Sequence, residues 1–146
     1  AVDPDAMGEP DDLAYPFAIP LMDGKGLPYI EPLAVWRAML GDLHLQTPIG
    51  TIAARFHRGL ARAIAGMVMK LAGNDREFET VALSGGCFQN RTLLQMVVEL
   101  LEGQAFRVLT HERVPANDGG IALGQAVIAV ANIEAEQDPQ RRTSCA

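Results

Sequence analysis

The sequence has few cysteines, a deficit of positive charge and no long hydrophobic run. Its two cysteines, Cys87 and Cys145, show neither CxxC nor zinc-finger spacing, which excludes a disulfide framework and a cysteine-based zinc site. Twelve basic and eighteen acidic side chains give a net charge of −6, which argues against nucleic acid as a partner. No apolar run reaches the roughly 20 residues of a membrane helix and no secretory leader is recognisable, so we expect a cytoplasmic protein without a membrane partner.

The 146 residues suffice for one domain, or for one lobe of a larger domain, with a hydrophobic core. Acidic residues are concentrated before residue 13, ahead of the first lysine or arginine, and we expect residues 1–14 to form an irregular acidic lead-in. We expect residues 15–132 to fold and residues 133–146 to form a flexible tail.

The amino-terminal half predicts a hairpin followed by two helices. Proline-containing segments that suit an edge position flank a glycine-rich turn. The first helix has Leu33, Trp36 and Leu40 on one apolar face, and the second has apolar residues at 3.6-residue spacing. The arginines of the second helix fall largely outside its apolar stripe and are interpreted as a solvated face: Arg55, Arg58 and Arg62. The expected elements are 15–22, 27–31, 32–43 and 51–71.

The carboxyl-terminal half predicts alternating strands and helices. Two short apolar segments predict buried strands, each followed by a helix, which is the pattern of a parallel β-α-β-α unit. Asn90 is placed to cap the helix between the strands. The expected elements are the strands 80–83 and 106–109 and the helices 91–102 and 119–132. The fold class is therefore α/β, with an N-terminal hairpin and helices before the parallel unit.

Two glycine turns at the carboxyl ends of these strands are the main functional signal. The first contains Ser84, Gly85 and Gly86, and the second is residues 117–120 (NDGG). Glycine lets a ligand approach the backbone, and the helix that follows presents N–H groups to an anion. In a parallel sheet such turns lie at the edge where ligands collect. They predict a nucleotide or phosphate site, although tight turns with simple helix caps explain the same residues.

Other candidate groups are weighed against structural roles. Asp118 could cap the last helix or hold a metal, and capping suits Asn117 equally well. Cys87 precedes a helix and could be an activated nucleophile, but no histidine is near it in the sequence. The three histidines form neither an HxxxH nor an HExxH pair, and His57 is interpreted as solvated or locally bonded. No complete metal site and no catalytic residue can be assigned from these patterns.

The combined motifs resemble the carboxyl-terminal end of the HypF family, the carbamoyltransferases of nickel–iron hydrogenase maturation. The resemblance rests on three segments and their spacing: 83–91 (LSGGCFQNR), 106–109 (FRVL) and 115–126 (PANDGGIALGQA). The segments 15–17 (YPF) and 52–57 (IAARFH) are similar to preceding parts of the family, so the resemblance covers residues 15–131. The family usually carries valine at the position of Cys87, which weakens the case for a nucleophile there.

The resemblance implies a fold and a reaction. The fold is the second lobe of an actin-like ATPase, or ribonuclease H-like, domain within a multidomain protein. The reaction uses carbamoyl phosphate and ATP to form carbamoyl adenylate, and the carbamoyl group then passes to the carboxyl-terminal cysteine of HypE to become a cyanide ligand of the hydrogenase. The implied partners are a HypE-like acceptor and the remaining HypF domains. The isolated lobe is expected to be inactive.

The resemblance also implies roles for residues of both turns. By matching position, Asp118 is a ligand of a divalent metal, iron or zinc, whose other ligands are histidines of a first lobe that this chain lacks. We expect Asn90 and Asp118 to share one rim of the cleft. The implied nucleotide-binding residues are Ser84, Gly85, Gly86, Asn90, Gly119 and Gly120.

Two alternatives stay open at this point. One is a relative of the tRNA threonylcarbamoyl transferases, to which residues 88–90 and 117–120 correspond less well. The other is a noncatalytic, nucleotide-responsive docking module that binds a partner protein.

Overall fold

The computed structural model describes residues 2, 13–24, 26–73 and 77–137. The chain divides into two compact units. The first unit contains residues up to Ala82 together with Asn90–Leu109, and the second contains Leu83–Gln89 and the residues from Thr110 onward. Most of the predicted acidic lead-in lies outside the described residues.

The first unit begins with a proline-rich hairpin. Ala18 pairs with Glu31 and Leu21 pairs with Pro28 as isolated antiparallel bridges, which confirms the predicted pairing. The Glu31 N–H donates to the Ala18 carbonyl at 2.8 Å, and the Ala18 N–H donates back at 3.2 Å. The bridges do not merge into a longer ladder because the prolines of both segments have no N–H to donate.

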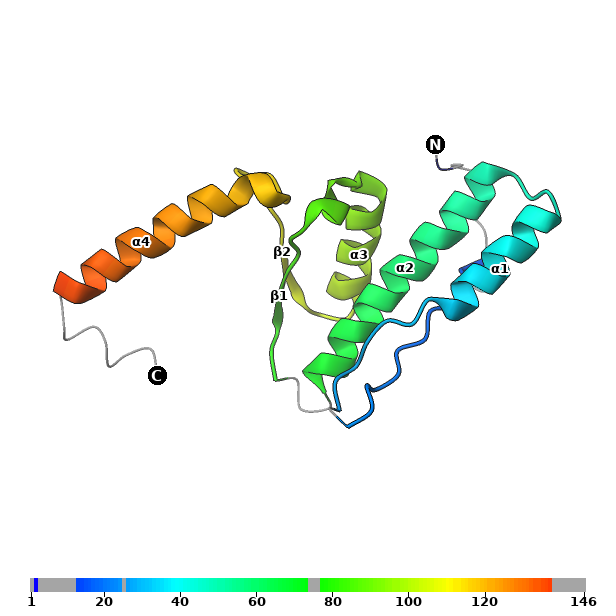
Figure 1. Cartoon of the computed structure of the whole chain (residues 1–146), viewed down its shortest axis with the longest axis horizontal. Coiled ribbons are helices and arrows are strands. Elements are labelled where there is room, and N and C mark those ends of the chain that lie inside the picture. Colours follow the sequence, from blue (N-terminus) through cyan, green and yellow to red (C-terminus); the bar gives the residue numbers. More distant parts are fainter. Residues whose placement is uncertain (1, 3–12, 25, 74–76, 138–146) are drawn as a thin grey trace. The chain divides into compact units, whose positions relative to one another are not determined.

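The hairpin leads into α1 (Leu33–His44) and α2 (Ile49–Ala72), which lie side by side in Figure 1. Glu31 assists the start of α1, because its Oε1 accepts a hydrogen bond from the Leu33 N–H at 2.8 Å. Gly73 ends α2 with a φ of +65°, a left-handed conformation that glycine adopts without strain. Both helices are confirmed, with bounds close to the predicted ranges.

The predicted apolar face of α1 does not supply the core. Leu33, Trp36 and Leu40 are all at least half exposed, whereas Val35 is buried. Asp42 follows Val35 by two helical turns and therefore lies on the same side of α1. The hydrogen bond between Asp42 and Tyr15 holds this side of the helix against the amino-terminal segment. The core cluster and the side chains packed against it are Tyr15, Val35, Ile52, Phe17, Ala38, Met39 and Phe56.

The arginines of α2 also differ from the expectation. Arg58 is only 7% exposed, and Arg55 forms an ion pair with Asp42 in which Nη1 and Oδ2 are 2.8 Å apart. The interpretation as a solvated face holds for Arg62 alone. A single apolar stripe could not reveal this, because α1 and α3 both pack on α2 and bury more than one of its faces.

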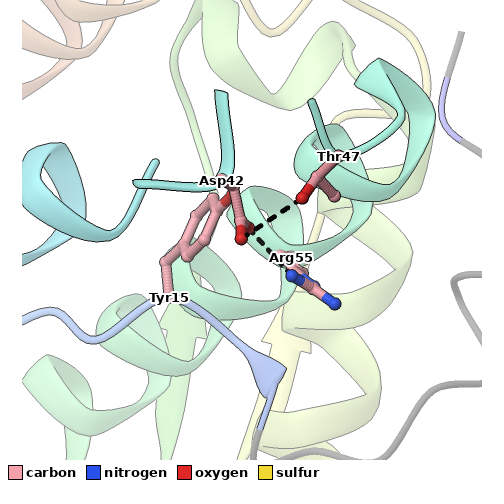
Figure 2. Close-up of polar contacts among 4 residues, drawn as sticks. All are labelled: Tyr15, Asp42, Thr47 and Arg55. Carbon is pink, nitrogen blue, oxygen red and sulfur yellow. Dashed lines mark hydrogen bonds and ion pairs between the residues drawn. The ribbon is translucent and has the colours of Figure 1, made fainter. Parts of the chain in front are cut away.

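A polar cluster attaches the amino-terminal segment to these helices, as Figure 2 shows. The Tyr15 hydroxyl donates to Asp42 Oδ2 at 2.6 Å, and Arg55 Nη1 donates to the same oxygen at 2.8 Å. Burial alone would raise the pKa of Asp42, but the hydrogen bonds from Tyr15 and Arg55 and the charge of Arg55 hold that pKa below its ordinary value. Burial, and then the hydrogen bond to Asp42, raises the pKa of Tyr15.

The rest of the first unit is a parallel β-α-β arrangement, as predicted. Its elements are β1 (Thr80–Ala82), α3 (Arg91–Gly103) and β2 (Arg107–Leu109). Val81 lies opposite Val108 in the register. α3 buries Leu93, Val97 and Leu101, which recur every four residues, and it lies between α2 and the strands in Figure 1. The α/β class with a small parallel sheet is thereby confirmed.

The second unit consists of turns and one long helix. Its elements are η3 (Gly86–Gln89), η4 (Asp118–Gly120) and α4 (Ile121–Gln137). The last helix is thus preceded by a 3-10 turn, and it continues past the predicted end at residue 132. Residues 138–146 of the predicted tail lie outside the described part of the chain. The side chains at residues 121–134 are exposed, including its aliphatic ones. No helix in the described part of the chain meets the length and apolarity of a membrane span.

Candidate functional site

The two glycine turns are joined to each other in the second unit. Gly85 has a φ of +117°, which a side chain would disfavour, and its N–H donates to the carbonyl of Ala116 at 2.8 Å. A Cβ added at Gly86 would lie 3.9 Å from the Cβ of Asn117, so the two chain segments run close together without crowding. The structure therefore brings Gly85 and Gly86 of the first turn to the start of the second.

The second turn is closed by Asn117 and not by Asp118. The Asn117 Oδ1 accepts from the Gly119 N–H at 3.0 Å, and its carbonyl accepts from the Gly120 N–H at 3.1 Å. A Cβ at Gly120 would lie 3.0 Å from both the Pro115 carbonyl oxygen and a Val114 methyl group. The close packing of the turn thus explains why glycine is needed at position 120. Of the two candidate caps, Asn117 and Asp118, Asn117 is the one that caps the turn.

Asp118 is left with an exposed side chain at the first position of η4. Within the described residues no three histidine, cysteine, aspartate or glutamate side chains gather as metal ligands would. Cys87 is a free, exposed thiol in η3. The second turn therefore offers one carboxylate of the type that binds a divalent ion, and within the described residues this is not a complete metal site.

Ser84 has a partner that the sequence analysis did not assign to the site. Its Oγ lies 3.0 Å from Nε2 of His111, and both side chains are exposed. Together with Asn117, Gly120 and Ile121 they line a hollow of about 530 Å³ in the second unit, within the size range of small-molecule sites. One signal could have revealed His111: it follows the end of β2 by two residues, just as Ser84 follows the end of β1.

Asn90 lies in the first unit, where it caps α3 as predicted. Its Oδ1 accepts from the Leu93 N–H at 3.2 Å, and its Nδ2 lies 2.7 Å from Nε2 of His57 on α2. His57 also contacts the Ala53 carbonyl through Nδ1 at 2.7 Å, which confirms a locally bonded histidine. The expected common rim of Asn90 and Asp118 stays a prediction, because these residues belong to different units.

A second hollow, of about 430 Å³, lies between α2 and α3 in the first unit. Its lining includes Arg58, Arg62 and Arg91 together with Thr92 and Glu99. Three guanidinium groups against one carboxylate give this groove an excess of positive charge, whereas the sequence analysis treated the two α2 arginines as part of a solvated face.

The protein class follows from comparison with known families. A family model described as "Carbamoyltransferase, Kae1-like Domain, second subdomain" matches residues 5–125. The carbamoyltransferase HypF of Rhodobacter capsulatus is 47% identical over 85 residues, which cover 57% of this chain and 11% of that protein. The HypF of Synechocystis is 34% identical over 110 residues, which cover 73% of this chain and 13% of that protein. The chain belongs to the HypF carbamoyltransferase family, and it spans only a small fraction of the length of these relatives.

Solved structures agree with this assignment. A crystal structure of full-length HypF in a phosphate- and nucleotide-bound form matches with a TM-score of 0.74 and 34% identity, covering 88% of this chain and 16% of that one. The HypF of T. kodakarensis matches with a TM-score of 0.65 and 24% identity, covering 89% of this chain and 16% of that one, and supports the fold alone.

Proposed function

We propose that this chain acts as the second subdomain of a longer carbamoyltransferase and forms one side of its nucleotide-binding cleft. The observation that carries the proposal is the hydrogen bond from Gly85 to Ala116, which joins the two glycine turns in a chain of this family. The similar full-length HypF was crystallised with phosphate and nucleotide bound. We further propose that the subdomain is a lobe of an actin-like ATPase fold and that it works in the cytoplasm.

The proposed reaction has two steps. Carbamoyl phosphate, ATP and water first give carbamoyl adenylate, with inorganic phosphate and pyrophosphate released. A cysteine thiolate of a HypE-like acceptor then attacks the carbamoyl carbon, so that a C–S bond forms and AMP leaves. The charge that develops on the reacting phosphoryl and carbonyl oxygens requires oriented hydrogen-bond donors. Ser84 and His111 supply such donors at the hollow of the second unit, and the turn glycines Gly85 and Gly86 leave space for a ligand beside the backbone.

A divalent metal in this cleft would supply further charge stabilisation. Asp118 is the one residue of the second turn with a suitable carboxylate, and the described residues do not complete its coordination. We propose that iron or zinc is held by Asp118 together with ligands from the rest of the longer protein.

Metal binding by Asp118 can be tested by Asp118→Asn in the longer protein that contains this chain. The amide keeps the size of the side chain and removes its charge, so we expect metal affinity to fall by at least about tenfold, comparable to losses measured for altered metal sites. Elemental analysis after dialysis against a metal buffer measures the occupancy. Asp23→Asn, in the exposed hairpin turn, is the matched control. Equal metal occupancy in the two variants would show that Asp118 is not a metal ligand.

The isolated 146-residue chain is expected to show no carbamoyl transfer, because it supplies only one side of the cleft. Carbamoylation of a HypE-like acceptor cysteine, followed by mass spectrometry, should therefore stay at the level of the reaction without protein. Measurable turnover by the chain alone would contradict the requirement for the other domains.

The two alternatives differ in what supports them. The matching family model and the names of the similar proteins favour a HypF carbamoyltransferase over a tRNA threonylcarbamoyl transferase. A noncatalytic docking module would bind the acceptor protein as an isolated chain and would leave carbamoyl transfer by the longer protein unchanged when Asp118 is altered.

A further inference from the structure

His57 belongs to a segment that the proposed function does not use. It lies on α2 and is half-buried, with its ring edge-on to Phe56 at a centroid distance of 6.2 Å. Both ring nitrogens are 2.7 Å from a polar atom: Nδ1 from the Ala53 carbonyl oxygen and Nε2 from Nδ2 of Asn90. A histidine with two short contacts to two different elements is fixed in orientation.

These contacts form a directed series of hydrogen bonds. The Ala53 carbonyl can only accept, so Nδ1 of His57 donates to it, and Nε2 is the acceptor that faces the Asn90 amide. Nδ2 of Asn90 then donates to Nε2, and Oδ1 of Asn90 accepts from the Leu93 N–H at 3.2 Å. Each partner determines the orientation of the next.

The contact with His57 exceeds what a helix cap requires. A cap needs only the Asn90 oxygen, and its amide nitrogen could point into solvent. With His57 in place, turning the amide around would set Oδ1 against the acceptor Nε2 and the NH2 group against the Leu93 N–H. Both contacts would be repulsive, so the amide has one orientation.

In that orientation Asn90 retains one N–H and one oxygen lone pair beyond the bonds described. A ligand group that both accepts and donates can satisfy the two together. Hydroxyl groups and the edge of an aminopurine have this property, whereas a phosphate at neutral pH has mainly acceptor oxygens. The geometry favours a nucleoside group over a phosphate as the partner of Asn90.

We propose that His57 is a positioning residue that fixes the Asn90 amide so that it binds the nucleoside part of the nucleotide. The inference rests on the proposed function, together with the nucleotide contact that the family resemblance implies for Asn90. It adds the residue that orients Asn90 and the part of the ligand that Asn90 recognises.

The orientation is tested in the free 146-residue chain by the side-chain NH2 resonances of Asn90 in an isotope-labelled sample. His57→Phe keeps a ring and removes the acceptor, and His57→Gln offers a carbonyl oxygen in its place. We expect the Asn90 resonances to move toward those of a solvated amide in His57→Phe and to return toward their original positions in His57→Gln, while the Leu93 N–H signal stays in place. His44→Phe, at the exposed end of α1, is the matched control and should change none of them. Unchanged Asn90 resonances in His57→Phe would overturn the positioning role.

The ligand is tested in the longer protein that contains this chain, because the chain supplies only one side of the cleft. The unaltered protein and the same variants are titrated with adenosine and with inorganic phosphate. We expect His57→Phe and Asn90→Ala each to weaken adenosine binding by roughly tenfold, the equivalent of about 1.4 kcal/mol, and to leave phosphate binding unchanged. If Asn90→Ala weakens adenosine binding and His57→Phe does not, the proposed site stands and the inference about His57 is wrong. Equal losses for adenosine and phosphate in His57→Phe also overturn it, because they indicate a general structural defect. If the unaltered longer protein does not bind adenosine, or if neither variant weakens its binding, the role of Asn90 in nucleotide binding fails as well.

Discussion

Gly59→Ala is expected to destabilise the chain by about 3 kcal/mol, at the upper end of the usual cost of inserting atoms into a packed interior. Gly59 is buried in α2, where the amino-terminal segment crosses the helix. A Cβ at this position would overlap the carbonyl oxygen of Tyr15 and would lie 3.2 Å from a ring carbon of Phe17. The backbone of Tyr15 cannot rotate away as a long side chain could, and its N–H is bonded to the Arg55 carbonyl at 3.2 Å. The segment must therefore separate from α2.

Chemical denaturation followed by far-ultraviolet circular dichroism measures this loss. Gly41→Ala is the matched control, because Gly41 lies inside α1 with no atom within 4 Å of an added Cβ. There the higher helix propensity of alanine is expected to stabilise the protein by about 0.5–1 kcal/mol. The two substitutions are chemically identical, but they should change the free energy of unfolding in opposite directions. Similar effects of the two would show that the contact between Gly59 and Tyr15 is not as close as described.

Asp42→Asn is expected to destabilise the chain by about 2 kcal/mol, since hydrogen bonds to a charged group usually contribute about 1.5–3 kcal/mol. The side chains of Asp42 and Arg55 are 15% and 19% exposed, so solvent screens their ion pair only in part. The asparagine would leave the guanidinium of Arg55 without its carboxylate and would weaken the hydrogen bond from Tyr15. Thermal or chemical unfolding at neutral pH measures the difference from the unaltered chain.

The pH dependence gives a second readout of the same cluster. The folded pKa of Asp42 is below the ordinary value of 3.8, so its contribution to stability is present above that pH and is lost as the pH falls through the folded pKa. The folded pKa of Tyr15 is raised, so its contribution is present below the ordinary value of 10.0 and is lost as the pH rises above it. The difference between Asp42→Asn and the unaltered chain should therefore be largest at neutral pH and shrink in acid. Asp23→Asn, in the exposed hairpin turn, should show no such dependence on pH, and a difference that stays constant in acid would contradict the role of the Asp42 charge.

The elements that the sequence predicted well depend on local interactions. The bounds of α3 follow from Asn90 as its cap, and the end of α2 follows from Gly73, because each residue satisfies or releases backbone groups within one turn. The parallel pairing of β1 and β2 follows from two short apolar segments separated by a helix. The last helix was placed less well, since a 3-10 turn precedes it and its apolar residues give no clear end signal.

Contacts between distant segments could not be predicted in this way. The hydrogen bond from Asn90 to His57 spans 33 residues and the bond between His111 and Ser84 spans 27. Neither has a sequence pattern of its own, because a histidine at the end of a strand or on a helix face has many possible partners. The cluster around Asp42 is a similar case. The helical spacing of α1 favoured Leu33, Trp36 and Leu40 as its buried face, but the hydrogen bond between Asp42 and Tyr15 stabilises the arrangement in which the Val35 face is buried instead.

The sequence by itself determined where the chain forms helices, where glycine interrupts it and which family it belongs to, because caps, turns and motifs are properties of residues near one another along the chain. Only the tertiary structure decided which face of α1 is buried, that Arg58 lies inside and which histidine holds Asn90. Those outcomes depend on the simultaneous packing of three helices and a hairpin, where burial and hydrogen bonding of one segment fix the choices left to the others.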